Sequence, residues 1–279
     1  MVGSGCRERR PNQGKKSDLC PSLDLETDGV LLRIVTWNIK RNVDAFAYAR
    51  DVLKADAIFF QESPGLPEGC GFTGTHRNID ERGAKRRWGN TSAVAEGFTL
   101  EDVALETSYS GSLVSSLITT PQGMRLGVVN MYGLFERPGS DSRGGVANPG
   151  LHRRLSDVAF WLYGQVEPKV DSFIVLGDWN QHRVMDQKFK SDYQRQSANN
   201  FFNRFDDYSL VDLVAHHFEE SPQTYRAVRG SYPWQLDHMY VTESKLGCFT
   251  EVQVDSSPGA DAISDHRPVL TVLDATMKY

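Results

Sequence analysis

The sequence predicts a single α/β domain with more than one β-sheet, over residues 29–279, behind a polar tail at residues 1–28. Three observations support this prediction. Short apolar runs of strand length recur along the chain and outnumber the helical patterns. Neither a repeat period nor a linker-like stretch marks a second domain. Hydrophobic residues make up 39% of the 279 residues, which is enough for a sizeable core.

The first 28 residues differ in composition from the rest of the chain. They are rich in Gly, Ser, Pro and charged residues and show no apolar periodicity, so we predict a disordered tail. Its basic residues, among them Arg9, Arg10 and Lys15, could assist binding to a polyanion. A solvated tail is the simpler interpretation.

From Leu31 onward the apolar runs have the length of buried strands. Strands are predicted at residues 31–36, 57–60, 113–119, 126–131, 173–176, 236–241, 251–254 and 269–273. The segment Val43–Leu53 has apolar residues at helical spacing behind a candidate cap at Asn42. A second helix is predicted at Leu151–Leu162. Before it, Gly133–Pro149 is predicted as a loop of a length that is usually functional or disordered.

Net charge, cysteine spacing and hydropathy argue against a strongly basic polyanion-binding protein, a zinc finger and a membrane protein. The formal net charge of −5 provides no overall attraction to nucleic acid or anionic membranes, so binding to a polyanion would need local basic patches or bound cations. The four cysteines show no metal-finger spacing, which predicts reduced thiols and a cytoplasmic location. No apolar run is long enough to cross a membrane and no signal peptide is evident, so no membrane association is expected.

Polar residues stand at one end of five predicted strands, where a core would not favour them. The segments are Thr36-Trp37-Asn38, Gln61-Glu62, Asn130-Met131-Tyr132, Gly177-Asp178-Trp179-Asn180 and Ser264-Asp265-His266. Each alone is more simply explained as a loop residue or a cap. Strand ends at one edge of a sheet converge, so together they predict a cluster of carboxylates and amides. Such a cluster needs a cation, and its oxygen ligands suit Mg²⁺ or Mn²⁺ better than zinc.

These segments, together with Leu236-Asp237, resemble the successive signatures of the endonuclease/exonuclease/phosphatase, or DNase I-like, superfamily. They follow the family's chain order and span Leu31 to Leu273. The resemblance implies a four-layer αββα sandwich, with two mainly antiparallel sheets between helices and an active site at one end. It also implies a divalent-metal-dependent phosphoesterase.

The resemblance assigns the metal site to three residues. Glu62 matches the principal metal ligand, Asn38 matches a second metal-binding position, and Asp265 matches a carboxylate near the metal. The implied ion is Mg²⁺ or Mn²⁺. A structural alternative for Asn38 is a cap on the turn before the first predicted helix.

Five further residues match catalytic positions of the family. Asp178 and Asn180 match the pair that orients the attacking water and holds the phosphate. His266 matches the histidine that contacts the phosphate, and Asp237 the carboxylate that orients it. Tyr132 lies where the family has a histidine or tyrosine beside the leaving group. The alternatives are a simple turn at Asp178 and Asn180, and a structural buried pair of Asp237 with His266.

Several features favour a nucleic-acid substrate. Lys85, Arg86 and Arg87 precede Trp88, as in a loop that tracks a phosphate backbone and stacks on bases. Further arginines lie in or near the long loop, at Arg137, Arg143, Arg153 and Arg154. The segments Gln223-Thr224-Tyr225 and Trp234-Gln235-Leu236-Asp237 resemble the exonuclease III and abasic-site endonuclease branch. Substrate contacts are therefore predicted at Lys85, Arg86, Arg87, Trp88, Asn130 and Trp234.

Two other functions remain open at this point. One is a phosphatase or phosphodiesterase of a small or lipid phosphate, similar to inositol phosphatases or sphingomyelinases. Against it, Asn180 is followed by Gln181-His182-Arg183 and not by the Tyr-Arg of the inositol phosphatases. The other is a non-catalytic binding module, which would be expected to lack one of Glu62, Asp178, Asp237 or His266. The sequence leaves open DNA against RNA, internal against terminal cleavage, and one metal ion against two.

Overall fold

The computed structural model describes residues 31–81, 84–105, 107, 109–134, 149–162, 164, 170–182, 192–226 and 234–276. The predicted tail and most of the predicted loop at 133–149, with Arg137 and Arg143, lie outside the described residues.

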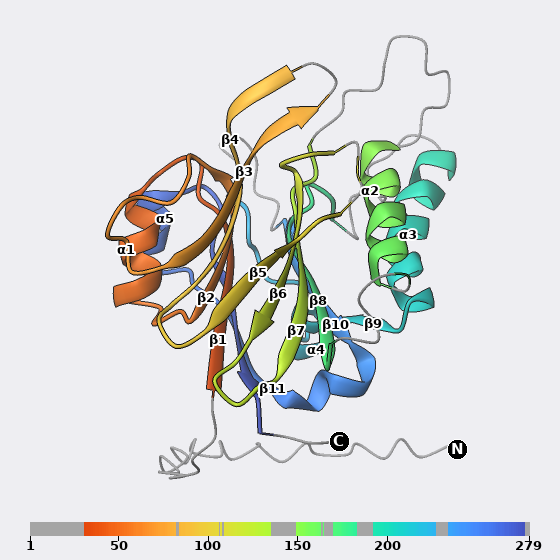
Figure 1. Ribbon diagram of the computed structural model, residues 1–279. Coiled ribbons are helices and arrows are strands. Elements are labelled where there is room, and N and C mark those ends of the chain that lie inside the picture. Colours follow the sequence, from red (N-terminus) through yellow and green to blue (C-terminus); the bar gives the residue numbers. More distant parts are fainter. Residues whose placement is uncertain are drawn as a thin grey trace, which may run out of the picture.

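Two six-stranded sheets pack face to face, and helices cover the outer face of each (Figure 1). The first sheet has the strand order β11-β12-β1-β2-β4-β3, and the second β5-β6-β7-β8-β10-β9. Only the pairs β1–β2 and β7–β8 are parallel among the pairings of the described strands. The predicted αββα sandwich with mainly antiparallel sheets is confirmed.

Eight strands and two helices lie where the sequence predicts them. Most of their ends agree within two residues, and some strands extend further than predicted. The first sheet contains β1 (Leu31–Asn38), β2 (Ala57–Ser63), β3 (Thr73–Glu81), β4 (Ala84–Val94), β11 (Phe249–Val254) and β12 (Val269–Asp274). The second contains β5 (Thr99–Val103), β6 (Leu113–Thr119), β7 (Arg125–Met131), β8 (Ser172–Asp178), β9 (Leu210–Asp212) and β10 (Asp237–Thr242). The helices are α1 (Asp44–Asp51), α2 (Pro149–Trp161), α3 (Asp192–Asp207), α4 (Leu213–His217) and α5 (Pro258–Ile263), with a 3₁₀ helix, η4, at Glu243–Cys248.

Three apolar clusters correspond to the three spaces between the layers. The central cluster joins the facing sheets, for example Ile34 of β1 and Ile174 of β8. The second cluster packs α2 and α3 against the second sheet, and the third packs α1 and α5 against the first. Because Val35 faces the third cluster while its neighbour Ile34 faces the central one, β1 is apolar on both faces. A strand buried on both faces appears in the sequence as a continuous apolar run.

Four strands were not predicted, and one of them corrects a prediction. The basic run at Lys85 to Trp88 is part of β4 and is not a loop. It pairs with β3, where Asp80 lies opposite Lys85 and their side-chain charges are 3.4 Å apart. Backbone pairing forms this strand although its solvent-facing side chains are polar, so it lacks the apolar run that marked the others.

The first helix also begins differently from the prediction. Val43 is the N-cap of α1 and makes no side-chain capping bond. Asn42 lies one residue earlier, where its Oδ1 accepts a hydrogen bond from the Asp44 amide at 3.0 Å. Its Nδ2 donates to the carbonyl of Ile263 at 3.2 Å, which ties the start of α1 to the end of α5.

Two further properties of the described residues bear on the sequence predictions. Cys70 and Cys248 are buried. Among the helices of the described segments, none has the length and apolar character needed to cross a membrane.

Candidate active site

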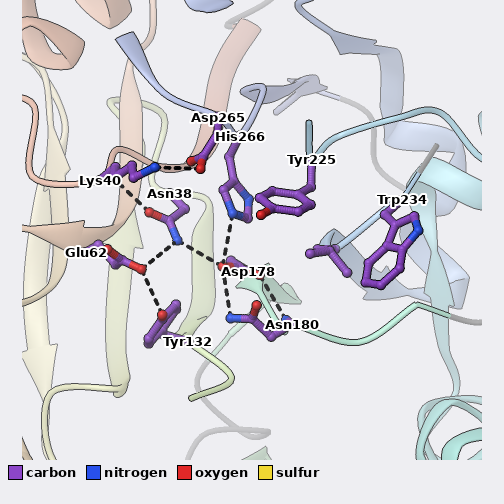
Figure 2. Close-up of a pocket in the computed structure, with 11 residues that line it drawn as sticks. Asn38, Lys40, Glu62, Tyr132, Asp178, Asn180, Tyr225, Trp234, Asp265 and His266 are labelled. Atoms are coloured by element: carbon purple, nitrogen blue, oxygen red, sulfur yellow. Dashed lines mark hydrogen bonds and ion pairs between the residues drawn. The ribbon is translucent and has the colours of Figure 1, made fainter. Parts of the chain in front are cut away.

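A cavity of about 290 Å³ opens where strand ends of the two sheets meet (Figure 2). Its lining residues are Asn38, Lys40, Glu62, Tyr132, Asp178, Asn180, Tyr225, Trp234, Leu236, Asp265 and His266. Eight of them are among the fourteen residues that were predicted as catalytic, metal-binding or substrate-binding. The remaining three, Lys40, Tyr225 and Leu236, were not predicted as site residues.

The sheet topology explains why these residues meet. Because β1 and β2 are parallel neighbours, Asn38 and Glu62 both lie at their carboxyl ends. Strands β7 and β8 are also parallel neighbours. Tyr132 follows the carboxyl end of β7, and Asp178 is the last residue of β8. Strand β10 runs antiparallel to β8 and begins with Asp237 directly opposite Asp178. Both sheets therefore present polar side chains at the same end of the sandwich.

One side of the cavity, the His266 side, consists of Asp178, Asp237 and His266. The Nδ1 of His266 lies 2.9 Å from Asp237 Oδ2, and its Nε2 lies 3.7 Å from Asp178 Oδ2. The first distance is that of a hydrogen bond, and the second is an ion-pair distance that leaves Nε2 free to turn toward a ligand. All three side chains are buried. Asp237 thus fixes the orientation of the imidazole ring.

Hydrogen bonds between neighbouring side chains and the backbone of His266 hold this histidine in place. The indole Nε1 of Trp37 donates to the His266 carbonyl at 2.8 Å, and the His266 amide donates to Ser264 Oγ at 3.1 Å. The Ser264 hydroxyl donates in turn to the Asn38 carbonyl at 2.7 Å. Next to the start of β10, Thr224 Oγ1 accepts hydrogen bonds from the amides of Leu236 and Asp237. The Trp-Asn and Ser-Asp-His segments are therefore joined directly.

Burial and neighbouring charge shift the pKa values of this side. Burial alone would lower the pKa of His266, but the carboxylates of Asp237, Asp178 and Asp265 outweigh it and raise the pKa to about 9. Burial raises the pKa of Asp178 to about 7, against the stabilising effects of His266, Asn38 and Asn180 on its charged form. At neutral pH the imidazole is therefore a cation, and Asp178 can exchange a proton.

The other side of the cavity, the Glu62 side, consists of Asn38, Glu62 and Tyr132. Glu62 Oε1 accepts hydrogen bonds from the Tyr132 hydroxyl at 2.8 Å and from Asn38 Nδ2 at 3.3 Å. The same Asn38 Nδ2 donates to Asp178 Oδ2 at 2.9 Å, so it bridges the two sides (Figure 2). Burial, followed by the charges of Asp178 and Glu62, raises the pKa of Tyr132 and keeps the phenol protonated.

The backbone is in the left-handed region at two of the predicted site residues. Glu62 has φ +48° and Asn180 has φ +50°. Asn180 tolerates this conformation better than most residues, but for Glu62 it is strained. In compensation, the Glu62 carbonyl accepts a 2.8 Å hydrogen bond from the amide of Arg41. Asn180 donates through its backbone amide and its Nδ2 to Asp178, at 2.9 and 3.2 Å.

Asp265, which was predicted, and Tyr225 and Lys40, which were not, make further contacts in the cavity. Asp265 does line the cavity, but its Oδ2 is 2.6 Å from Lys40 Nζ. The Tyr225 ring lies 4.8 Å from that of His266, between centroids, and Tyr225 forms isolated β-bridges to Trp234 and His266. Lys40 has no motif of its own and was indicated only by its neighbourhood to the Trp-Asn segment, whereas Tyr225 is itself the aromatic residue of the Gln223-Thr224-Tyr225 segment.

The predicted substrate-binding residues separate into two groups. Trp234 lines the cavity, and Trp88 reaches its edge by packing on Tyr132 with ring centroids 5.7 Å apart. The guanidinium of Arg86 lies 6.0 Å from the Trp88 ring. Lys85, Arg86 and Arg87 are exposed on β4.

Asn130 does not line the cavity, which argues against its predicted contact with substrate. It is fully buried between the sheets, where Oδ1 accepts from Gln61 Nε2 at 2.8 Å and Nδ2 donates to the Thr91 carbonyl at 3.1 Å. Arg154 is also fully buried, over the ring of Tyr109 at 4.2 Å. Both side chains make their polar contacts inside the protein, since buried polar groups need internal partners.

The donor set on the Glu62 side fits a divalent cation. Asp178, Asp237 and His266 also have ligand atoms within 4.8 Å of one another. In this group, however, Nδ1 of His266 is already hydrogen-bonded to Asp237 Oδ2. Glu62 has no ion-pair partner among the described residues, and its carboxylate faces that of Asp178 across Asn38. Oxygen ligands and uncompensated negative charge suit Mg²⁺ or Mn²⁺.

Comparison with known proteins yields solved structures but no sequence relatives: no family model and no curated protein matches the chain. An AP endonuclease from Archaeoglobus fulgidus superposes with a TM-score of 0.66 at 18% identity, over 88% of this chain and 100% of that one. The AP endonuclease LMAP from Leishmania major gives 0.62 at 15%, over 88% of each chain. The endonuclease domain of the retrotransposon TRAS1 gives 0.62 at 17%, over 88% and 100%.

These structures share the two-sheet sandwich and its helical layers with this chain over most of its length. The identities are low, so the likeness concerns the fold. The chain has the fold of the DNase I-like, or endonuclease/exonuclease/phosphatase, superfamily, to which the exonuclease III branch also belongs.

Proposed function

We propose that the chain is a divalent-metal-dependent phosphoesterase that hydrolyses phosphodiester bonds of nucleic acid. The observation that carries the proposal is the hydrogen-bonded pair of Asp237 and His266 opposite Asp178, beside an uncompensated Glu62 in one cavity. A phosphodiester resists attack because its oxygens are negative, so a site must neutralise charge and position a water molecule.

His266 supplies a fixed positive charge. Its Nδ1 is held by Asp237, and its Nε2–H is available to donate to a non-bridging phosphate oxygen. Because the ring is oriented before substrate binds, little reorganisation is required as negative charge develops on the phosphate. Asp237 acts as a positioning residue in this scheme.

Glu62 is the residue best placed to hold a divalent ion, with the amide oxygen of Asn38 as a candidate second ligand. A bound Mg²⁺ or Mn²⁺ supplies Lewis-acid polarisation of the phosphate and stabilisation of the leaving oxygen. In the structure Asn38 Oδ1 accepts the Lys40 amide at 3.1 Å, which fixes the side chain while leaving that oxygen a further lone pair.

Asp178 and Tyr132 are suited to move protons. A pKa of about 7 allows the Asp178 carboxylate to accept a proton from the attacking water, and Asn180 holds that carboxylate through two hydrogen bonds. Tyr132 remains protonated and donates to Glu62 in the structure; in this scheme its hydroxyl would donate instead to the departing oxygen.

The case for nucleic acid rests on the edge of the cavity. Trp88 contacts Tyr132, and Arg86 stacks over Trp88, so a cation and an aromatic ring extend from the site along β4. Arg86 and Trp88 lie on the same side of β4, because the guanidinium is 6.0 Å from the indole ring. Stacking of bases and contact with phosphates both fit such a surface.

Incubation of the full chain with a substrate panel tests the proposal. The panel contains labelled single- and double-stranded DNA, RNA, a duplex with an abasic site, and inositol phosphates, each with Mg²⁺, Mn²⁺ or EDTA. Asp178→Asn, purified identically, controls for contaminating nucleases. We expect metal-dependent cleavage of a nucleic acid by the wild type only.

The other outcomes separate the alternatives. Phosphate release from the inositol phosphates alone would replace the nuclease with a small-molecule phosphatase. Cleavage that persists in EDTA would contradict the metal requirement. Inactivity on the whole panel together with absence of Mn²⁺ binding would favour a non-catalytic module.

A further inference from the structure

Lys40 is the one cation besides His266 that lines the cavity, among the described residues. Its Nζ lies 2.6 Å from Asp265 Oδ2, and the lysine side chain is 51% exposed while that of Asp265 is 22% exposed. An ion pair this exposed contributes little to stability. Its main consequence is therefore electrostatic: the charge of Asp265 is compensated from within the chain.

The backbone at Lys40 is held in an unusual conformation that aims the side chain at the cavity. Lys40 has φ +49° and Arg41 has φ +66°, a left-handed pair without glycine. The turn is fastened by the Arg41 amide to the Glu62 carbonyl at 2.8 Å, and by the Ile39 amide to the Gln61 carbonyl at 3.0 Å. Strain of this kind persists only where surrounding contacts impose it. The same turn thus positions both Lys40 and Glu62.

The charges of the site can then be counted. Lys40 pairs with Asp265, and His266 lies between Asp237 and Asp178, at 2.9 and 3.7 Å. With Glu62, four carboxylates face two cations, which leaves a net charge of −2 when all of them are ionised. Asn38 bridges Glu62 and Asp178 through a neutral amide. A net charge of −2 matches one divalent cation. A second divalent ion at Asp265 would have to displace or repel the Lys40 ammonium.

We propose that Lys40 acts as a built-in cation that withdraws Asp265 from the metal ligands, so that the cavity binds a single divalent ion at Glu62. The proposal rests on the proposed function and revises the predicted ligand set, because Asp265 becomes the anchor of a lysine. Lys40 is a positioning residue here, and its ammonium adds a fixed positive charge on the side of the cavity away from Tyr132 (Figure 2).

Titration of the metal-free full chain with Mn²⁺ tests this, with free Mn²⁺ followed by electron paramagnetic resonance. We compare the wild type with Asp265→Asn, Lys40→Gln and Lys40→Arg. Lys54→Gln is a matched control, because Lys54 is an exposed lysine with φ +54° away from the cavity. Circular dichroism verifies the folding of each variant.

We expect the wild type, Lys40→Arg and Lys54→Gln each to bind one Mn²⁺ with a Kd within about threefold of one another, since none removes a ligand or changes the charge beside it. Asp265→Asn should also bind one Mn²⁺, about tenfold more weakly, because it leaves the Lys40 ammonium uncompensated. Lys40→Gln should bind Mn²⁺ about tenfold more tightly or bind a second ion, because it removes a repelling charge and releases Asp265.

Three results would overturn the inference while leaving a metal-dependent phosphoesterase intact. They are two ions bound by the wild type, loss of the ion or weakening by more than about a hundredfold in Asp265→Asn, and unchanged binding in Lys40→Gln. If the wild type binds no Mn²⁺ at all, the metal requirement of the proposed function fails, and the role of Lys40 fails with it.

Discussion

The two sides of the cavity hold charge in opposite ways. On the His266 side, a buried imidazolium lies 2.9 Å from one buried carboxylate and 3.7 Å from another. On the Glu62 side, one half-buried carboxylate receives only neutral hydrogen bonds, from Asn38 and Tyr132. The His266 side therefore has a cation of its own, whereas the Glu62 side has none and requires one. We expect variants of the two sides to fail in different ways.

The largest effect is expected on the Glu62 side. Glu62→Gln removes the metal-binding charge and keeps the shape, so kcat should fall by about a thousandfold or more, since a metal supplies several kcal/mol of charge stabilisation. Steady-state cleavage of the preferred substrate measures it. Glu68→Gln, at an exposed glutamate outside the cavity, should match the wild type. Full activity of Glu62→Gln would show that the cation is held elsewhere.

A smaller loss is expected on the His266 side. His266→Asn removes the imidazolium, and kcat should fall by about a hundredfold while metal binding remains. His216→Asn, at an exposed histidine, is the control. The experiment pairs kcat with thermal unfolding, because the variant leaves Asp237 buried without its partner. If His266→Asn folds and has the kcat of the wild type, the role of His266 is structural and not catalytic.

The pH dependence of stability is expected to follow the His266 side. The pKa values of His266 and Asp178, about 9 and about 7, both lie above those of the unfolded chain, so the folded state binds more protons. Stability should therefore fall as pH rises. The contribution of His266 is fully present below pH 6.5 and is lost as pH passes 9, by about 3 kcal/mol.

Urea denaturation in EDTA at several pH values from 6 to about 10 measures this change. His266→Asn should flatten the curve between the two pKa values of the histidine. Wild-type stability that is constant or rises over this range would mean that the folded protein does not hold His266 as a cation.

The smallest effect is expected at the edge of the cavity. Arg86→Gln should raise KM and lower the slope of log affinity against log salt by about one, the value for one lost phosphate contact. Arg87→Gln, at the neighbouring exposed arginine of β4, provides a control of equal charge. Equal effects of the two substitutions would indicate a diffuse attraction to β4 and no defined contact.

The sequence predicted the strands that carry the site because these strands are buried on both faces. β1 and β8 appear as continuous apolar runs that end at Asn38 and Asp178. β3 and β4 were not predicted because their polar side chains hide a strand formed by backbone pairing. Sequence patterns detect burial more readily than pairing.

The predicted site residues divide on a similar principle. A polar residue at a strand end was assumed to face the cavity, and this holds for Asn38 and Asp178. It does not hold for Asn130, whose side chain points between the sheets. Lys40 was not predicted because its partner, Asp265, is 225 residues away along the chain. Contacts of that range depend on the tertiary structure.

The division between the two sides is tested most directly by the Mg²⁺ dependence of the single-turnover cleavage rate. Wild type, His266→Asn and Glu62→Gln are compared on the substrate that the panel identifies. We expect His266→Asn to be slower at every Mg²⁺ concentration with a half-saturating concentration within about threefold of the wild type, since it leaves the ion's ligands in place. Glu62→Gln should have lost the Mg²⁺ response. A wild-type Mg²⁺ response in Glu62→Gln, or its loss in His266→Asn, would contradict the account.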